Sequence, residues 1–124
     1  AEHGTVSKPV GERAELESPN VVKVVTDFSG SALYFSRSLI PCLRSDAGPN
    51  AEAAHFKHIG LYVYRRDFLL GYSRMPIGPL ERAEKLEQLR ALENGHKIQV
   101  AETDYDSLGV DTPADLERLL RTLP

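Results

Sequence analysis

His58-Ile59-Gly60-Leu61-Tyr62-Val63-Tyr64 is the stretch that most clearly decides the fold. Its β-branched and aromatic residues are typical of a β-strand. Successive side chains of a strand point to opposite faces, which predicts one face with His58, Gly60, Tyr62 and Tyr64 and the other with Ile59, Leu61 and Val63. The first face could line a binding site, because each ring there carries a polar tip. It could equally pack inside the protein, with its polar atoms satisfied locally.

The segment before this strand predicts a hairpin. Val21 to Thr26 and Ala32 to Phe35 are apolar runs that read as strands, and Asp27 to Gly30 between them has turn chemistry. The polar residues 1–20 predict an irregular lead-in, with one short helical turn around Glu12 to Leu16.

The rest of the chain alternates between helical and strand patterns. The pattern predicts a loop over 41–54 and a short helix with Phe68, Leu69 and Tyr72. A longer helix is predicted from Leu80 to Glu93, with a Glu81–Lys85 pair and a stop at Asn94-Gly95. A strand from Lys97 to Ala101 and a helix from Thr112 to Leu123 follow. This order predicts an α/β protein, in which helices pack on a mixed sheet within one domain over residues 1–124.

Composition narrows the class of protein. The chain has 124 residues, 41% of them hydrophobic and 27% charged, with a net charge of −3. These values are typical of a soluble globular domain, and the absence of a basic run argues against nucleic acid as a partner. No stretch approaches the roughly 18 apolar residues of a membrane span. A single cysteine, Cys42, cannot form an internal disulfide, which favours a reducing cytoplasm.

Asp111 in Gly109-Val110-Asp111-Thr112-Pro113 is the strongest candidate for chemistry. It stands between a predicted strand end and a helix start, where α/β proteins often place ligands. A carboxylate there suits Mg²⁺, which prefers oxygen ligands. The alternative is that Asp111 only complements the positive end of the helix.

Two further groups of polar residues could bind a ligand. Glu84, Glu87, Gln88 and Arg90 would share a face of the predicted helix, which could bind sugar hydroxyls or simply be solvated. Arg37 and Arg44 flank a proline-bearing loop, where a guanidinium could bind a carboxylate or phosphate or remain in solvent. No glycine-rich phosphate loop is present in the sequence.

Five blocks resemble the CMP-KDO synthetases, the cytidylyltransferases that activate the eight-carbon acid sugar of lipopolysaccharide. They are residues 19–25, then 32–37 with Ile40-Pro41, then 58–65, then Pro79-Leu80-Glu81 with residues 86–90, and finally residues 109–117. Their order matches the family and covers nearly the whole chain. The resemblance implies a partial, Rossmann-like fold of the nucleotide-diphospho-sugar transferase type. It also implies a Mg²⁺-dependent reaction of CTP with KDO that yields CMP-KDO and pyrophosphate, in a cytoplasmic homodimer.

Residue roles follow from the same resemblance. Asp111 matches the family's catalytic, metal-binding aspartate, and His58, Tyr62, Glu87 and Gln88 match positions that contact the sugar. Arg37 is expected as a further sugar contact, with Tyr64 and Arg44 after it.

The chain also departs from the family pattern. Leu39 stands where a proline or small residue is usual. The Arg- and Lys-bearing loop that holds CTP, the cytosine-reading region and a second metal-binding aspartate have no counterpart. The chain is therefore expected to be the carboxy-terminal half of the enzyme, inactive by itself. The competing hypotheses are a non-catalytic module for self-association or sugar binding, and an unrelated interaction domain.

Overall fold

The computed structural model describes residues 2–103. Its elements, in chain order, are β1 (His3–Pro9), α1 (Arg13–Glu17), β2 (Lys23–Thr26), β3 (Ala32–Ser36), the 3₁₀ turn η1 (Ala51–Ala54), β4 (Phe56–Tyr64), α2 (Arg66–Gly71), the 3₁₀ turn η2 (Tyr72–Arg74), α3 (Pro79–Glu84), α4 (Leu89–Glu93) and β5 (Ile98–Glu102). The predicted helix from Thr112 to Leu123 lies outside the described residues.

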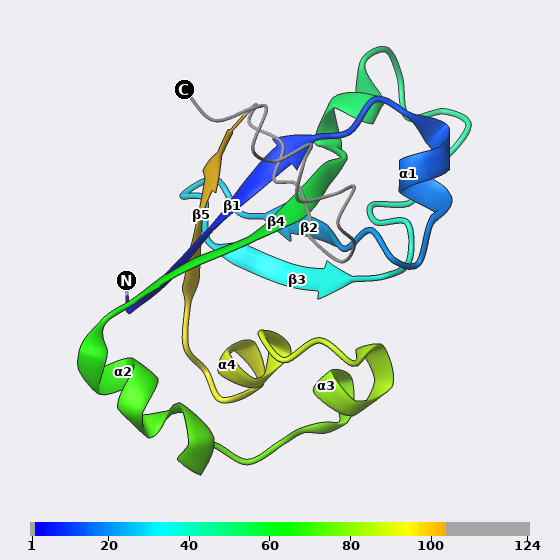
Figure 1. The fold of residues 1–124 in the computed structure, drawn as a ribbon. Helices are drawn as coiled ribbons and strands as arrows, with labels where there is room; N and C mark the ends of the chain where they lie inside the picture. Colours follow the sequence, from blue (N-terminus) through cyan, green and yellow to red (C-terminus); the bar gives the residue numbers. More distant parts are fainter. Residues whose placement is uncertain (1, 104–124) are drawn as a thin grey trace, which may run out of the picture.

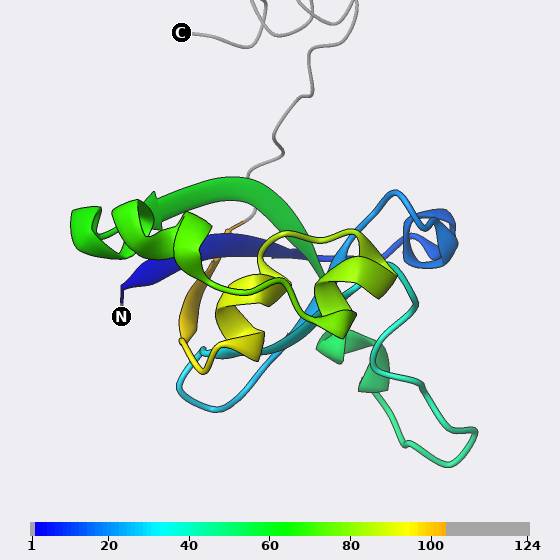
Figure 2. The same cartoon turned by 90° about the horizontal axis from the view of Figure 1, so that it is seen from below.

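The strands form one five-stranded mixed sheet in the order β3-β2-β4-β1-β5. β1 runs antiparallel to β4 and parallel to β5. Figure 1 shows α2, α3 and α4 on one side of this sheet, with α1 apart from them, and Figure 2 shows the three helices from below. The predicted mixed α/β class is confirmed. Within residues 2–103, no helix is long and apolar enough to cross a membrane.

The predicted hairpin is confirmed as β2 and β3, which pair in antiparallel fashion. The Asp27 Oδ1 atom accepts hydrogen bonds from the backbone N–H groups of Ser29 and Ser31, both at 2.9 Å. Gly30 has a φ of 85°, a conformation that favours glycine. Its carbonyl accepts a 2.8 Å hydrogen bond from the N–H of Val100 in β5, so the hairpin turn is fastened to the far edge of the sheet.

The prediction of an irregular segment over residues 1–20 is wrong, because β1 is a strand between β4 and β5. The short helical turn predicted within that segment is confirmed as α1. The inward residues of β1 are His3, Thr5 and Ser7, all buried and all polar. A strand whose buried face is polar lacks the apolar alternation by which strands are recognised in sequence.

The prediction of one helix from Leu80 to Glu93 is also wrong, because α3 ends at Glu84 and α4 begins at Leu89. Lys85 takes the left-handed conformation with a φ of 57°, which stops the helix there. The predicted partner of Glu81 was Lys85. Instead, the guanidinium of Arg90 donates two 2.8 Å hydrogen bonds to the Glu81 carboxylate. Glu93 reinforces this link by accepting a hydrogen bond of 2.9 Å from the Glu81 N–H.

The other predicted elements within residues 2–103 agree with the structure, except that the predicted loop over 41–54 contains η1. The short helix around Phe68 is α2, and the strand after residue 97 is β5. The stop at Asn94-Gly95 follows α4 directly. The core between the sheet and the helices is built around fully buried Phe35, Leu89 and Ile98. This core holds the α3–α4 turn in place relative to β4.

Candidate functional site

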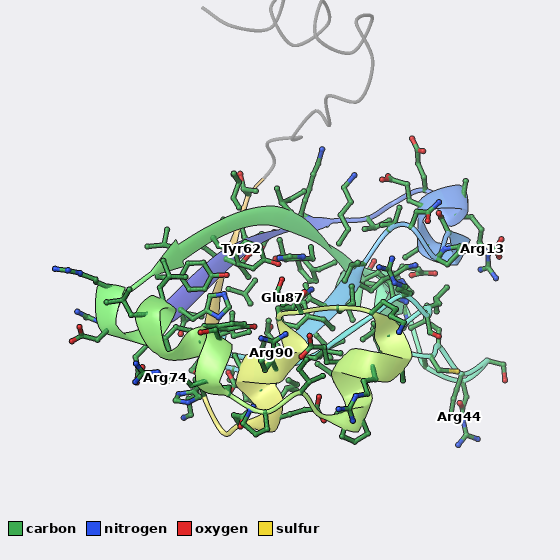
Figure 3. All side chains as sticks on the ribbon, turned by 60° about the horizontal axis from the view of Figure 1, so that its bottom comes forward. Arg13, Arg44, Tyr62, Arg74, Glu87 and Arg90 are labelled. Atoms are coloured by element: carbon green, nitrogen blue, oxygen red, sulfur yellow. The ribbon has the colours of Figure 1, made fainter. Side chains whose placement is uncertain are left out.

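A cavity of about 140 Å³ opens between β4 and the helices, and its lining residues are Tyr62, Tyr64, Leu69, Tyr72, Glu87 and Gln88. Figure 3 shows Tyr62, Glu87 and Arg90 gathered in the middle of the molecule. The cavity therefore brings together the predicted sugar contacts Tyr62, Glu87 and Gln88 with Tyr64, which was predicted as a weaker contact. Its volume is below the roughly 300–1,000 Å³ of complete ligand pockets, so these residues can enclose only part of a ligand.

An irregularity in β4 sets the positions of its polar residues. The register moves from Thr5 opposite Tyr62 to Val6 opposite Ile59, which leaves two residues of β4 without partners in β1. The Thr5 hydroxyl closes this gap by donating a 2.7 Å hydrogen bond to the Leu61 carbonyl. Because two residues are extra, the alternation is preserved and His58 stays on the same face as Tyr62.

His58 lies beside the cavity rather than in its wall. Its ring centroid is 5.3 Å from that of Tyr62, and its Nε2 atom is 2.8 Å from the Thr5 hydroxyl oxygen. Burial, with a smaller effect of His3, lowers the pKa of His58 to about 4. The imidazole is therefore neutral at physiological pH and serves as a hydrogen-bonding group without charge.

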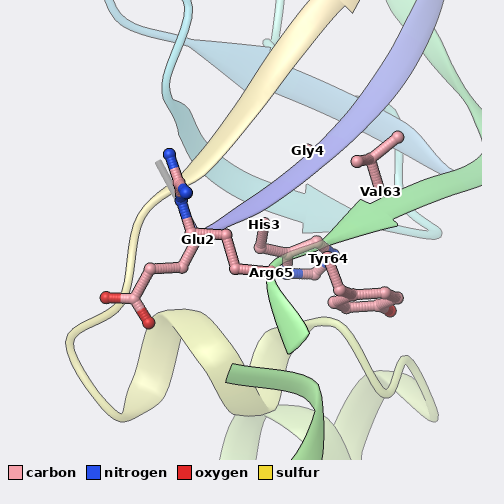
Figure 4. A pocket seen from close by; sticks show the side chains of 6 residues that line it. All are labelled: Glu2, His3, Gly4, Val63, Tyr64 and Arg65. Atoms are coloured by element: carbon pink, nitrogen blue, oxygen red, sulfur yellow. The ribbon is translucent and has the colours of Figure 1, made fainter. Parts of the chain in front are cut away.

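Stacked aromatic rings support the cavity from beneath. His3 stacks on Tyr64 at 4.4 Å between centroids, and the Phe68 ring lies 5.6 Å from His3 and 6.1 Å from Tyr64. Figure 4 shows His3 next to Tyr64 in a second pocket, where β1 begins and β4 ends. Rings packed in this way have few alternative rotamers, so the tyrosines are held in place before any ligand arrives.

The tyrosine hydroxyls of the cavity stay protonated. Burial raises the pKa of Tyr62 and Tyr64 above the ordinary value, and nearby Glu87 adds to the effect. Burial, Tyr64 and Glu87 together raise the pKa of Tyr72 to about 12. Neutral phenols can donate hydrogen bonds to a carboxylate or accept them from sugar hydroxyls, so the cavity offers polar contacts without extra negative charge.

Glu87 and Gln88 are held by the turn between α3 and α4, not by a helix face. The Tyr72 hydroxyl donates a 2.6 Å hydrogen bond to the Glu87 carbonyl, and the Arg90 guanidinium lies 5.2 Å from the Tyr72 ring centroid. The Gln88 side chain is buried, whereas Glu87 is exposed. The expected shared helix face is therefore corrected, since Glu84 lies in α3 and Arg90 in α4.

Sequence reasoning missed two of the lining residues, Leu69 and Tyr72. The sequence pattern places both in a short helix, and nothing local connects them to residue 87. No local signal in the sequence marks Tyr72 as a lining residue.

The other predicted site residues lie elsewhere. The Arg37 guanidinium donates hydrogen bonds to the carbonyls of Pro19, Glu84 and Lys85. Arg44 is an exposed residue 3.5 Å from Asp46, on the outlying loop visible in Figure 3. Asp111 lies outside the described residues. Within residues 2–103, no group of three or more His, Cys, Asp or Glu side chains is arranged to hold a metal ion. The roles expected of Arg37, Arg44 and Asp111 in the site stay predictions.

Known proteins resemble the chain closely. It is 61% identical over 118 residues to the 3-deoxy-manno-octulosonate cytidylyltransferase of Solibacter usitatus, a match that covers 95% of this chain and 46% of that protein. It is 58% identical over 121 residues to the enzyme of the same name from Syntrophotalea carbinolica, covering 94% of this chain and 48% of the relative.

A solved structure of CMP:2-keto-3-deoxy-manno-octonic acid synthetase in complex with CTP has the same fold, with a TM-score of 0.82 and 44% identity over 95% of this chain and 47% of that one. The chain thus spans about half the length of the relatives it matches. The family model for cytidylyltransferases matches residues 2–98. Because that match covers well over half of the sequence, the chain belongs to the cytidylyltransferase family.

Proposed function

We propose that this chain is the carboxy-terminal, sugar-binding half of a 3-deoxy-manno-octulosonate cytidylyltransferase, which makes CMP-KDO for lipopolysaccharide. The observation that carries the proposal is the cavity in which Tyr62, Glu87 and Gln88 meet, residues that the resemblance assigns to sugar binding. Curated relatives of that name, at 61% and 58% identity, support the substrate class.

In the proposed reaction, the anomeric hydroxyl oxygen of KDO attacks the α-phosphorus of CTP. A new oxygen–phosphorus bond forms, the bond to the β-phosphate oxygen breaks, pyrophosphate leaves, and the hydroxyl proton is released. The residues of this chain act mainly by holding the sugar, which lowers the entropic part of the barrier. Glu87 would accept hydrogen bonds from sugar hydroxyls, while His58, Tyr62 and Gln88 orient the ring.

The nucleotide and the metal belong to the same proposal. The structurally similar synthetase was solved with CTP, which supports CTP as the nucleotide. Mg²⁺ would neutralise charge that builds up on the phosphates, with Asp111 as one ligand. We propose a cytoplasmic homodimer, as the family resemblance implies.

A pyrophosphate-release assay with CTP, KDO and Mg²⁺ tests the activity. We expect turnover by the full-length protein that carries this chain and none by residues 1–124 alone. The absence of turnover by the full-length protein would contradict the proposed function. Turnover by the isolated chain would instead show that no complementary half is needed.

Replacing Gln88 with alanine is expected to raise the KM for the sugar about tenfold, because a buried hydrogen-bonding group next to the cavity is lost. The KM for CTP should stay the same. Gln99→Ala is the matched control, since Gln99 lies in β5 and its amide donates to the Ser29 carbonyl instead. Unchanged sugar kinetics in Gln88→Ala would remove Gln88 from the site.

Asp111→Asn is expected to lower kcat more than tenfold in the full-length enzyme while the melting temperature stays nearly constant. The substitution removes a charge suited to Mg²⁺ but keeps the side-chain size. Steady-state kinetics and thermal unfolding on the same sample give the comparison. A lower melting temperature with normal kcat would assign Asp111 to the helix terminus instead.

A further inference from the structure

We propose that Arg37 is a positioning residue that holds the α3–α4 turn, and with it Glu87 and Gln88, in the geometry for sugar binding. The inference rests on the proposed function and goes beyond it. It replaces the expected direct contact between Arg37 and the sugar with an indirect role. The argument comes from the partners of Arg37 on both its side chain and its backbone.

The guanidinium of Arg37 joins three backbone carbonyls. Its Nε atom donates to the Glu84 carbonyl at 2.7 Å, and one terminal nitrogen donates to the Lys85 carbonyl at 3.3 Å. The other terminal nitrogen donates to the Pro19 carbonyl at 3.0 Å. The fork of donors is therefore directed at protein atoms, and it ties the end of α3 to the segment before β2.

The backbone of Arg37 is fixed as firmly as its side chain. Its N–H donates a 2.9 Å hydrogen bond to the Glu84 carboxylate. Its carbonyl accepts a 2.9 Å hydrogen bond from the ammonium of Lys23, a side chain with no exposed surface. The Arg37 backbone is therefore held rigidly just after β3, so its side chain can fix the position of α3.

The end of α3 is where such a clamp has the greatest effect. The last carbonyls of a helix have no partner within it, and α3 has only six residues. The start of α3 is already linked to α4 through Glu81, which bonds to Arg90 and Glu93. The end has Arg37. Glu87 follows Lys85 by two residues, so a shift of the clamped carbonyls moves Glu87 and Gln88 in the cavity.

The geometry also explains why an arginine is needed. Three carbonyls in different directions require several donors in a planar fork, which the compact ammonium of lysine cannot supply. A direct contact with a sugar carboxylate would need the positive charge, which lysine retains. Arg37→Lys therefore separates the two roles.

The test is a kinetic cycle in the full-length enzyme with Arg37→Ala, Arg37→Lys, Gln88→Ala and the double variant Arg37→Ala/Gln88→Ala. We expect both Arg37 variants to raise the KM for KDO about fivefold to tenfold without changing the KM for CTP. In the double variant, Arg37→Ala should raise the KM for KDO by clearly less than it does alone, because the part of its effect that acts through Gln88 is already lost and only the part through Glu87 remains. Arg13→Ala, an exposed arginine in α1, is the control that should behave like the parent.

Hydrogen exchange gives a readout without substrate. We expect faster exchange in residues 84–89 of both Arg37 variants, with β4 and β5 unchanged. Full sugar binding by Arg37→Lys, or effects that multiply in the double variant, would overturn the positioning role while the proposed function stands. If Gln88→Ala itself leaves the KM for KDO unchanged, the sugar site fails instead. Where Arg37→Ala does not fold, Arg37→Lys carries the same cycle.

Discussion

Replacing Lys23 with alanine is expected to lower the free energy of unfolding by about 3–5 kcal/mol. The Lys23 side chain has no exposed surface, and its ammonium donates hydrogen bonds of 2.7 Å to the Ser18 carbonyl and 2.9 Å to the Arg37 carbonyl. Alanine would remove both hydrogen bonds and leave a cavity in place of three methylene groups and the ammonium. Urea unfolding followed by circular dichroism measures the change.

Lys23→Met separates the hydrogen bonds from the packing. Burial lowers the pKa of Lys23, so the charged form carries a desolvation cost that methionine removes. Methionine also fills the space but makes neither of the two hydrogen bonds. We expect a loss of about 1–3 kcal/mol, smaller than that of alanine. Lys97→Ala, at an exposed lysine, should change stability by less than about 0.5 kcal/mol. A more stable Lys23→Met would contradict the stabilising role of the two hydrogen bonds.

The elements that could be predicted from the sequence are those with local causes. The β2–β3 hairpin follows from two β-branched runs around Asp27 to Gly30, whose turn needs a positive φ at the glycine. The strand over 58–64 has strong aromatic and β-branched character, and the end of α4 follows from Asn94-Gly95. In each case the sequence of a few residues is sufficient.

The elements that were missed depend on distant partners. β1 was not recognised because its buried residues are polar, and the Thr5 hydroxyl bonds to carbonyls and the His58 ring of β4, far along the chain. The break at Lys85 is equally non-local, because the carbonyls that it exposes are bound by Arg37 in β3's exit segment. The hydrophobic periodicity predicts one continuous helix there, since Leu80, Leu86 and Leu89 fit its spacing.

The candidate site shows the same difference between features with local causes and features that depend on distant partners. The alternation of β4 put His58 and Tyr62 on one face but left open whether that face binds or packs. The structure shows packing for one residue and a cavity wall for the other, and binding there stays a prediction. Tyr62 lines the cavity, whereas the ring of His58 packs behind it against Thr5. The pairing of Tyr62 with Glu87 and Gln88 came from the family resemblance, because no local pattern connects residues so far apart in sequence.

His3→Phe is expected to remove about 3 kcal/mol of acid-induced destabilisation. Burial lowers the pKa of His3 to about 4, well below its ordinary value of 6.5. Above pH 6.5, His3 is neutral in both states, so its titration does not affect stability there. Between pH 6.5 and pH 4 the unfolded chain takes up the proton first, so stability falls as the pH falls. Below pH 4 both states are protonated, and this residue causes no further loss.

Phenylalanine suits the surroundings of His3 at neutral pH as well. Within residues 2–103, neither ring nitrogen of His3 has a hydrogen-bond partner, although the side chain is 1% exposed. The ring instead stacks on Tyr64. An apolar ring of similar size removes two unpaired polar atoms, so His3→Phe should gain about 1–2 kcal/mol at pH 7.5.

Urea unfolding of His3→Phe and His3→Gln at pH 7.5 and pH 4.5 provides the measurement. Both substitutions remove the titrating group, so both should reduce the acid loss by a similar amount. They should differ at pH 7.5, where glutamine buries an amide among Tyr64 and Phe68 and lowers stability. An unchanged acid loss in both variants would show that His3 does not titrate with folding. The remaining acid loss should come from His58, whose pKa is also lowered to about 4 by burial.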